Sequence, residues 1–354
     1  TGGITMEFKL TPDHEAIIAD VRAFAKKEIA PFAAEIDAES KFPAEIIKKM
    51  AELGYMGINI PEEYGGAGLD DVYKVLVVRE IAKCCASTAE ILAVQCLTEA
   101  GAGSDASAAR TKAVSDGDNY IINGSKCFIS NMGPEEGDYV ILIALTDPSA
   151  GVKGMSAIIV DRGTPGFSIG KVEDKMGIRG AAVSELVFED CVVPKTNLIG
   201  KEGEGFKIAM SALDGGRIGI AAQALGIAEA AIDASVEYSK QRSQFGKPIS
   251  ALQGIQWYLA DMATRTEAAK LLILQAADMR SRGENVTKEA AMAKYFASEN
   301  AVYVTDRAVQ IHGGYGYMKD YPIERMYRDA RITPLYEGTS EVQKMVISRA
   351  VIGK

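Results

Sequence analysis

The sequence contains few of the side chains on which metal and catalytic-triad chemistry depends. Two histidines, His14 and His312, occur in 354 residues, and neither has a partner at a metal-ligand spacing. We therefore expect no metal site and no Ser-His-Asp triad. The five cysteines form no Cys-x-x-Cys pair, and Cys84 and Cys85 are adjacent, which favours buried thiols in a reducing compartment over a disulfide framework.

The chain also lacks an excess of positive charge and a long apolar run. Its net charge of -9 argues against a nucleic-acid partner, because phosphate binding requires clustered Lys and Arg. No apolar run approaches the roughly 20 residues that cross a bilayer, and no signal-peptide pattern leads the chain, so no membrane partner is expected. With 47% hydrophobic and 25% charged residues, the sequence predicts a globular protein of two or three domains.

Three kinds of sequence pattern follow one another along the chain. From Leu10 to about Gln95, apolar residues recur at helical spacing. From Cys96 to about Asn197, short β-branched and aromatic runs such as YVILIAL alternate with Gly, Pro and Asp, which indicates strands. After Gly205 the helical period returns in Ala-rich stretches that are typical of a close-packed bundle. The order is therefore helices, then strands, then helices.

Glycine-containing motifs in the middle and late segments predict turns. Asn123 and Gly124 predict a β-hairpin turn, because both residues tolerate positive φ. The segment GAGSDA, residues 101–106, fits the dinucleotide-binding pattern G-x-G-x-x-A, and Asp118 follows where a ribose-binding acid would stand. That site needs a following helix, whereas this chain continues into strands, so we favour a loop. GKEGEG, residues 200–205, lacks the Lys-Ser or Lys-Thr of a P-loop and is expected to join the β segment to the bundle.

Six motifs occur in one order along the chain: PEEYGGAGLDD, LTEAGAGSDA, INGSKCFISN, QRSQFGKPI, AVQIHGGYGY and LYEGTSEVQ. Through them the chain resembles the acyl-CoA dehydrogenase family along nearly its whole length. The resemblance implies an α+β fold with an N-terminal α-helical domain (residues 6–95), a middle β-barrel or sandwich domain (residues 96–200) and a C-terminal four-helix bundle (residues 201–354). A bacterial cytoplasm, or the mitochondrial matrix in a eukaryote, is the expected location.

The resemblance also implies an activity. Such enzymes use FAD to convert short- or medium-chain acyl-CoA thioesters to 2-enoyl-CoA, pass the electrons to an electron-transfer flavoprotein and assemble as homotetramers, dimers of dimers. Two alternatives remain open for this chain. It could be an acyl-CoA oxidase that uses dioxygen, or a homologue that binds CoA esters without catalysis.

The family's catalytic base matches Glu337, in the stretch PLYEGTSEV. In the family this carboxylate removes the α-proton while a hydride passes to flavin N5, and burial raises its proton affinity. The backbone N–H of Glu337 and a flavin ribityl hydroxyl would stabilise the enolate oxygen. Tyr336 would wall the thioester against the flavin, and Gly338 would let substrate pass close to the backbone. Without the resemblance, EGTSE would be interpreted as a helix-capping turn.

A second position in the bundle carries the base in one branch of the family. In this chain that position is Gly216, which has no side chain to act, so Glu337 has no evident rival.

The resemblance assigns flavin contacts to two strand segments. Leu97 and Thr98 would lie along the edge of the flavin ring, while Phe128 and Ser130 of FISN would cover its face away from substrate. The commoner family pattern is WITN, so the ring cover is smaller here. Taken alone, a Phe in an alternating strand would be interpreted as a core residue.

The remaining implied contacts belong to the outer parts of the cofactor and to coenzyme A. The pyrophosphate and adenosine of a neighbouring subunit's FAD would be bound by Arg242, Phe245, Gln253, Gln310, Gly313 and Gly314. From their own subunit, Thr339 and Glu341 would lie near the cofactor. Ser104 is expected to contact cofactor and coenzyme A, and Asp214 and Arg217 of the turn DGGR to bind coenzyme A. A solvated surface turn is the alternative interpretation of DGGR.

The chain departs from the family between Gln95 and Cys96, where relatives carry an additional helix and loop over the acyl pocket. A true deletion would open the pocket to water. Alternatively, the sequence joins residues across a segment that is missing between them. In that case we expect a separation much larger than the about 3.8 Å between consecutive Cα atoms.

Overall fold

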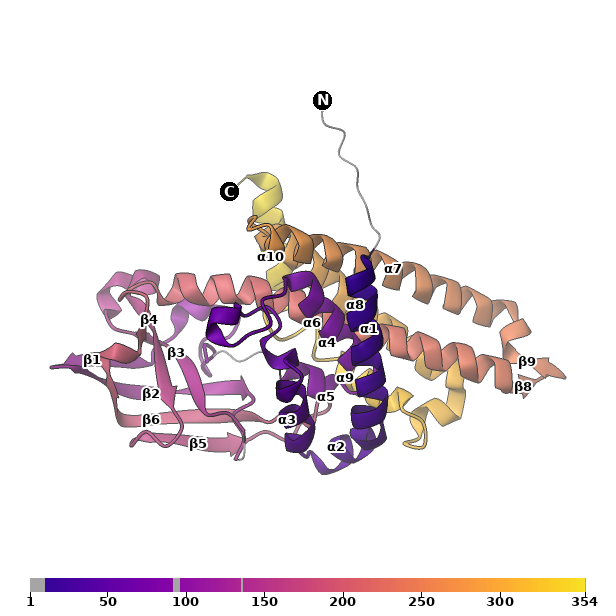
Figure 1. Ribbon diagram of the computed structural model, residues 1–354, viewed down its shortest axis with the longest axis horizontal. Coiled ribbons are helices and arrows are strands. Elements are labelled where there is room, and N and C mark those ends of the chain that lie inside the picture. Colours follow the sequence, from indigo (N-terminus) through magenta and orange to yellow (C-terminus); the bar gives the residue numbers. More distant parts are fainter. Residues whose placement is uncertain (1–9, 92–95, 135, 354) are drawn as a thin grey trace.

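A computed structural model describes residues 10–91, 96–134 and 136–353, and its elements follow the predicted order of helices, sheet and helices (Figure 1). The expected large separation between Gln95 and Cys96 lies outside the described residues, because residues 92–95 are not among them. The N-terminal helices are α1 (Pro12–Phe24), α2 (Ala33–Glu39), α3 (Ala44–Glu52), α4 (Asp71–Ala82) and α5 (Ala86–Glu90).

The start of α1 accounts for one of the two histidines. The Thr11 side chain accepts a hydrogen bond from the backbone N–H of His14 at 3.2 Å, and the His14 ring accepts from the backbone N–H of Thr11 at 3.3 Å. This reciprocal capping box satisfies two backbone donors at the helix start, and Pro12 occupies the first helical position. His14 is therefore a structural residue that caps α1.

The middle segment forms a seven-stranded sheet in the order β5-β6-β2-β1-β3-β4-β7. Neighbouring strands pair antiparallel except for the single parallel pair between β1 and β3. Its apolar residues, among them Ile122, Leu142 and Phe188, form a core of their own. The strands are β1 (Lys112–Asp116), β2 (Asn119–Ser130), β3 (Tyr139–Leu145), β4 (Met155–Asp161), β5 (Phe167–Val172), β6 (Val183–Pro194) and β7 (Leu198–Ile199).

The predicted hairpin turn at Asn123 and Gly124 is wrong. Both residues lie inside β2, where the pairing with β6 shifts register between Ile122 and Gly124, and the turn falls before Asn119 instead. Gly124 has φ +149°, and a Cβ there would come within 2.6 Å of Thr111 Oγ1. The glycine thus permits a bulge and a close approach of two strands, which are further roles of glycine in a sheet. The loop interpretation of GAGSDA holds, because antiparallel strands follow it.

The C-terminal segment is built around one long helix, α6 (Gly205–Gln241), which runs from the sheet to the opposite end of the molecule (Figure 1). This helix is long and apolar enough to cross a membrane, but 67% of its most apolar window is buried within the fold, as in the core helix of a globular protein. The other elements are β8 (Ser243–Gln244), β9 (Lys247–Pro248), α7 (Gln253–Ser281), α8 (Thr287–His312), α9 (Ile323–Ala330) and α10 (Ser340–Ile352).

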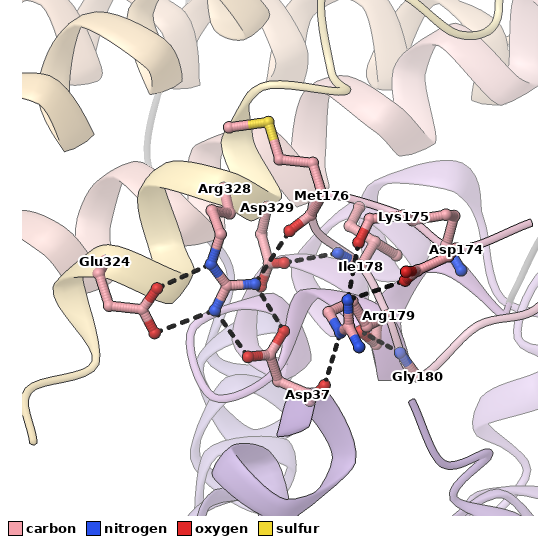
Figure 2. A network of polar contacts seen from close by, with 11 residues as sticks. Asp37, Asp174, Lys175, Met176, Ile178, Arg179, Gly180, Glu324, Arg328 and Asp329 are labelled. Atoms are coloured by element: carbon pink, nitrogen blue, oxygen red, sulfur yellow. Dashed lines mark hydrogen bonds and ion pairs between the residues drawn. The ribbon is translucent and has the colours of Figure 1, made fainter. Parts of the chain in front are cut away.

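A polar network joins the three segments beside the bundle, and Figure 2 shows Arg328 between two carboxylates. Arg328 of α9 donates to both oxygens of Asp37 in α2, at 2.8 and 2.6 Å, and to both oxygens of Glu324. It also donates to the carbonyl of Met176, in the connection between β5 and β6, at 3.0 Å. The adjacent Asp329 accepts from the backbone N–H of Ile178 at 2.6 Å. Arg328 therefore connects the helical segments to the sheet.

Candidate active site

Glu337 lies in the loop between α9 and α10, in a backbone conformation that is unusual for its residue type. Its φ is +52°, in the left-handed region, and that of the following Gly338 is +90°. A non-glycine residue in such a conformation costs about 1–3 kcal/mol and persists where its surroundings enforce it. Here Gln343 Nε2 donates to the carbonyls of Glu337 and Gly338 at 3.1 and 2.9 Å, and Lys294 Nζ donates to that of Gly338 at 2.7 Å. These bonds hold the loop in place.

The Glu337 carboxyl group is buried at one of its oxygen atoms and has a raised pKa. The residue as a whole is partly exposed, but its Oε2 atom is buried and has no hydrogen-bond partner among the described residues. Burial raises the pKa of this carboxyl to about 7, although the charges of Arg217, Lys294 and Lys74 favour its ionised form. These cations come from α6, α8 and α4. A carboxyl group with such a pKa can accept a proton near neutral pH.

Gly216 in α6 provides the space that the Glu337 carboxyl occupies. A Cβ at Gly216 would lie 2.6 Å from Glu337 Oε2, which is closer than real Cβ contacts. The two family positions for the base therefore face the same point in this fold. Glycine normally weakens a helix interior, so its presence here is explained by this contact.

We expect Gly216→Ala to separate stability from activity. The added methyl group would displace the Glu337 carboxyl, while alanine favours the helix over glycine by up to about 1 kcal/mol. The thermal transition should therefore stay or rise while turnover falls at least about tenfold, since small misplacements of catalytic groups are costly. Gly219→Ala is the matched control, because nothing lies within 4 Å of its Cβ position. Equal turnover in the two variants would contradict the proposal that Gly216 leaves space for the Glu337 carboxyl.

Asp214 and Arg217 correct a second sequence-based prediction, because DGGR is part of the continuous helix α6 and is not a turn. Arg217 is 5% exposed and donates to Asp214 Oδ1 at 2.8 Å, while Asp214 Oδ2 accepts from Thr287 of α8 at 2.7 Å. The Nε atom of Arg217 is buried without a partner among the described residues. The surface-turn interpretation is therefore wrong. Ser104 is exposed in its loop.

The residues expected beside the flavin ring are brought together at one end of the sheet. The carbonyl of Thr98 accepts from the backbone N–H of Cys127 at 3.0 Å, and that of Leu97 accepts from Lys126 Nζ at 2.9 Å. Phe128 is 66% exposed, with φ +56°, so its interpretation as a core residue is wrong. An exposed aromatic ring beside backbone and hydroxyl groups fits a planar aromatic cofactor such as the flavin of FAD.

The residues expected at the outer cofactor lie at the other end of the molecule. Phe245, in the turn between β8 and β9, is 90% exposed, and the Arg242 guanidinium lies 5.6 Å from the centre of the Tyr315 ring. Figure 1 shows this hairpin far from the sheet. The structure thus separates these residues from Phe128 within one chain. Also exposed at this end are Gln253, Gln310, Gly313 and Gly314.

The last two predicted cofactor residues lie at the start of α10. Thr339 caps this helix by accepting from the backbone N–H of Val342 at 3.3 Å, and Glu341 is exposed in its first turn. EGTSE therefore does cap a helix, and it presents Glu337 at the same time. The two interpretations of this stretch are compatible.

Several residues near Glu337 were missed by the sequence analysis. The Tyr336 hydroxyl donates to Gln223 Oε1, and the pKa of the carboxyl of Glu90 responds to Glu337. Lys294 is fully buried, and its burial lowers its pKa to about 8. A signal for Glu90 and Lys294 was present, because each interrupts an apolar helical stretch with a charge, and such residues are seldom buried without a partner.

Family models match almost the entire chain. The N-terminal domain of acyl-CoA dehydrogenases matches residues 11–110, the middle domain residues 95–191 and the C-terminal domain residues 203–352. The fold and site therefore define an oxidoreductase of the flavoprotein type. The chain belongs to the acyl-CoA dehydrogenase family.

Individual relatives are similar over nearly their full length. An acryloyl-CoA reductase (NADH) of Anaerotignum propionicum is 54% identical, with 98% of this chain and 96% of that protein covered. The butyryl-CoA dehydrogenase of Megasphaera elsdenii is 44% identical in sequence and superimposes with a TM-score of 0.95, covering 98% of this chain and 100% of that one. A chain from a structure of the "electron transferring flavoprotein of Acidaminococcus fermentans" is 48% identical and superimposes with a TM-score of 0.96. The match covers 99% of this chain and 100% of that one.

The alignment with the Anaerotignum protein extends over 381 positions, which is more than the 354 residues of this chain. That relative therefore contains residues that have no counterpart here.

Proposed function

We propose that the protein dehydrogenates short-chain acyl-CoA thioesters to 2-enoyl-CoA, with Glu337 as the base that removes the α-proton. The observation that carries this proposal is the buried Glu337 Oε2 atom, which has no hydrogen-bond partner among the described residues and whose carboxyl has a pKa raised to about 7. Because no other group hydrogen-bonds to Glu337 Oε2 among the described residues, this oxygen is free to accept a proton from a substrate. The similarity to a butyryl-CoA dehydrogenase supports a short acyl chain.

The loop that presents Glu337 would also stabilise the substrate as it loses its proton. Among the described residues, the backbone N–H of Glu337 donates no hydrogen bond to another backbone group. This N–H would donate to the thioester oxygen that becomes an enolate. One such donor lowers the barrier by about 3–4 kcal/mol. Gln343 and Lys294 keep the loop rigid through its carbonyl groups, so the donor is positioned before the substrate arrives.

FAD is the cofactor that this site would hold. When bound, it supplies the acceptor for the hydride that leaves the β-carbon. Phe128 would cover one face of its ring, Ser130 would donate a hydrogen bond at the ring edge, and Leu97 and Thr98 would line that edge. We further propose that the electrons pass to an electron-transfer flavoprotein, which the similarity to the Acidaminococcus chain supports.

A second candidate function is the reverse reaction, the reduction of a short 2-enoyl-CoA. The observation that favours it is the 54% identity to an acryloyl-CoA reductase. In this direction Glu337 would return the proton to the α-carbon, as microscopic reversibility requires. The same residues would act in both directions, so the electron partner would decide which direction prevails.

The proposal can be tested with an anaerobic absorption spectrum of the purified holoprotein. Addition of butyryl-CoA should decrease the flavin absorbance, and addition of crotonyl-CoA to the reduced protein should restore it. Oxygen consumption during turnover in air would indicate an oxidase. A protein that is purified without flavin and binds CoA esters would be a binding module instead.

Arg242 provides a test of the shared cofactor site. We propose that it binds the pyrophosphate of a neighbouring subunit's FAD, because guanidinium groups donate bidentately to phosphate. Arg242→Ala should then lower FAD occupancy and the thermal stability of the oligomer together, since cofactor and subunit binding both favour the folded state. Flavin content per chain and calorimetry measure the two effects. Unchanged flavin content would show that Arg242 does not bind FAD.

A further inference from the structure

The active site contains a second buried acid, Glu90, which is the last residue of α5. Its residue exposure is 7%, and its Oε2 atom has no hydrogen-bond partner among the described residues. The proposed dehydrogenation needs one base, and Glu337 supplies it. A second buried carboxyl group that lacks a partner is costly for the folded protein, so its presence requires an explanation.

Glu90 faces both walls of the proposed substrate site. In the loop between α9 and α10, the charge of Glu337 raises the pKa of Glu90 and a hydrogen bond with Tyr336 lowers it. A hydrogen bond with Ser130, at the end of β2, also lowers this pKa. Ser130 is the residue proposed to lie at the flavin edge, whereas Glu337 is the proposed base. Glu90 therefore lies close to both the proposed base and a residue proposed to contact the flavin.

Tyr336, Gln223 and Ser130 hydrogen-bond to the Glu90 carboxyl, but its Oε2 atom has no partner among the described residues. The Tyr336 hydroxyl donates to Gln223 Oε1, and Gln223 Nε2 donates to the carbonyl of Ala86 at 2.8 Å. These two groups therefore divide their hydrogen bonds between Glu90 and a second acceptor.

Glu90 and Glu337 also differ in the charges that surround them. Three cations favour ionisation of Glu337, whereas the groups that act most strongly on Glu90 are Glu337, Tyr336, Gln223 and Ser130, none of which is a cation. Burial and the charge of Glu337 raise the pKa of Glu90 to about 8. At neutral pH Glu90 is therefore a neutral acid with one O–H donor, beside an acid that ionises more readily.

We propose that Glu90 is a specificity-determining residue whose carboxyl donates a hydrogen bond to an oxygen on the acyl group beyond the two reacting carbons. This inference rests on the proposed function. Its substrate class is a short acyl-CoA with a hydroxyl or carbonyl oxygen at the far end of the acyl group. An alkyl chain of the same length would bury the Glu90 carboxyl without a partner, and sites built to bind a polar group reject apolar analogues strongly.

The test compares 4-hydroxybutyryl-CoA with pentanoyl-CoA, which differ by a hydroxyl group in place of the terminal methyl. Affinity is measured by calorimetry and kcat/KM by flavin reduction, both with the holoprotein at about pH 6.5, where Glu90 is neutral. The native protein should prefer the hydroxylated ester at least about tenfold in both measurements. Glu90→Leu should abolish this preference, and Glu90→Ala should do the same if the leucine variant does not fold. Glu90→Gln, which retains a donor, should keep most of it.

Equal or weaker binding of 4-hydroxybutyryl-CoA by the native protein would overturn the inference, and so would an unchanged preference in Glu90→Leu or Glu90→Ala. The binding measurement needs no turnover, so it decides the role of Glu90 even in a protein that reduces no flavin. Absence of flavin reduction by either ester and by butyryl-CoA would instead contradict the proposed dehydrogenase activity.

Discussion

Glu337→Gln is expected to abolish most of the flavin reduction by butyryl-CoA while leaving FAD binding intact. The amide has nearly the same shape as the carboxylate but cannot accept the α-proton, so the rate should fall by at least about a hundredfold. Stopped-flow measurement of flavin reduction under anaerobic conditions gives this rate directly. A calorimetric titration with butyryl-CoA should show affinity close to that of the native protein. Near-native reduction by the variant would exclude Glu337 as the base.

The pH dependence of the same rate gives an independent check. Because only the ionised carboxylate accepts a proton, and burial raises its pKa to about 7, reduction by the native protein should be slow below neutral pH and rise through about pH 7. The residual rate of Glu337→Gln should lack this rise. Glu52→Gln, an exposed acid at the end of α3, is the control and should behave like the native protein.

Arg328→Met should cause a large loss of stability, although it lies outside the proposed active site. The variant leaves Asp37 and Glu324 facing each other without the cation that bridges them, and it removes the bond to the Met176 carbonyl. Loss of one partner in a fully buried ion pair costs about 3–5 kcal/mol, which is an upper bound here because the Arg328 side chain is 20% exposed. Differential scanning calorimetry should show a clearly lowered transition. A limited proteolysis time course should show earlier cleavage between the helical segments and the sheet.

Arg282→Met is the matched control for this prediction. Arg282 also bridges two carboxylates, those of Asp278 and Glu284, but its side chain is 51% exposed. Exposed ion pairs contribute about 0–1 kcal/mol, so this variant should unfold near the native temperature. If both variants lost stability equally, the location of the Arg328 network between the segments would have no special importance.

The sequence predicted the architecture because it leaves local patterns. Helical spacing and β-branched runs distinguish the three segments, and they correspond to the observed helices and sheet. Glu337 was identified through its motif. Its burial, its left-handed backbone and its bonds to Lys294 and Gln343 could not be predicted, since they depend on contacts with α8 and α10.

Two of the wrong predictions came from glycines, whose structural role depends on residues distant in the sequence. Asn123-Gly124 was taken for a turn, but the approach of Thr111 makes it a bulge within β2. DGGR was taken for a turn because glycine disfavours helices. In the structure it remains helical, and Gly216 makes room for a carboxyl group more than a hundred residues later in the sequence. No local window contains that information.

The length of α6 constrains any assembly in which these chains complete each other's proposed cofactor sites. Along this helix Gly216 and Arg242 are separated by about 39 Å at 1.5 Å per residue, so each protomer presents the proposed reaction site at one end and the hairpin proposed to bind phosphate at the other. Two protomers can complete each other's sites when their α6 helices lie antiparallel about a two-fold axis. In such a dimer each site is complete, and no further protomer is needed. A head-to-tail arrangement would instead form a closed ring or, where the rotation does not close, a filament with an incomplete site at each end.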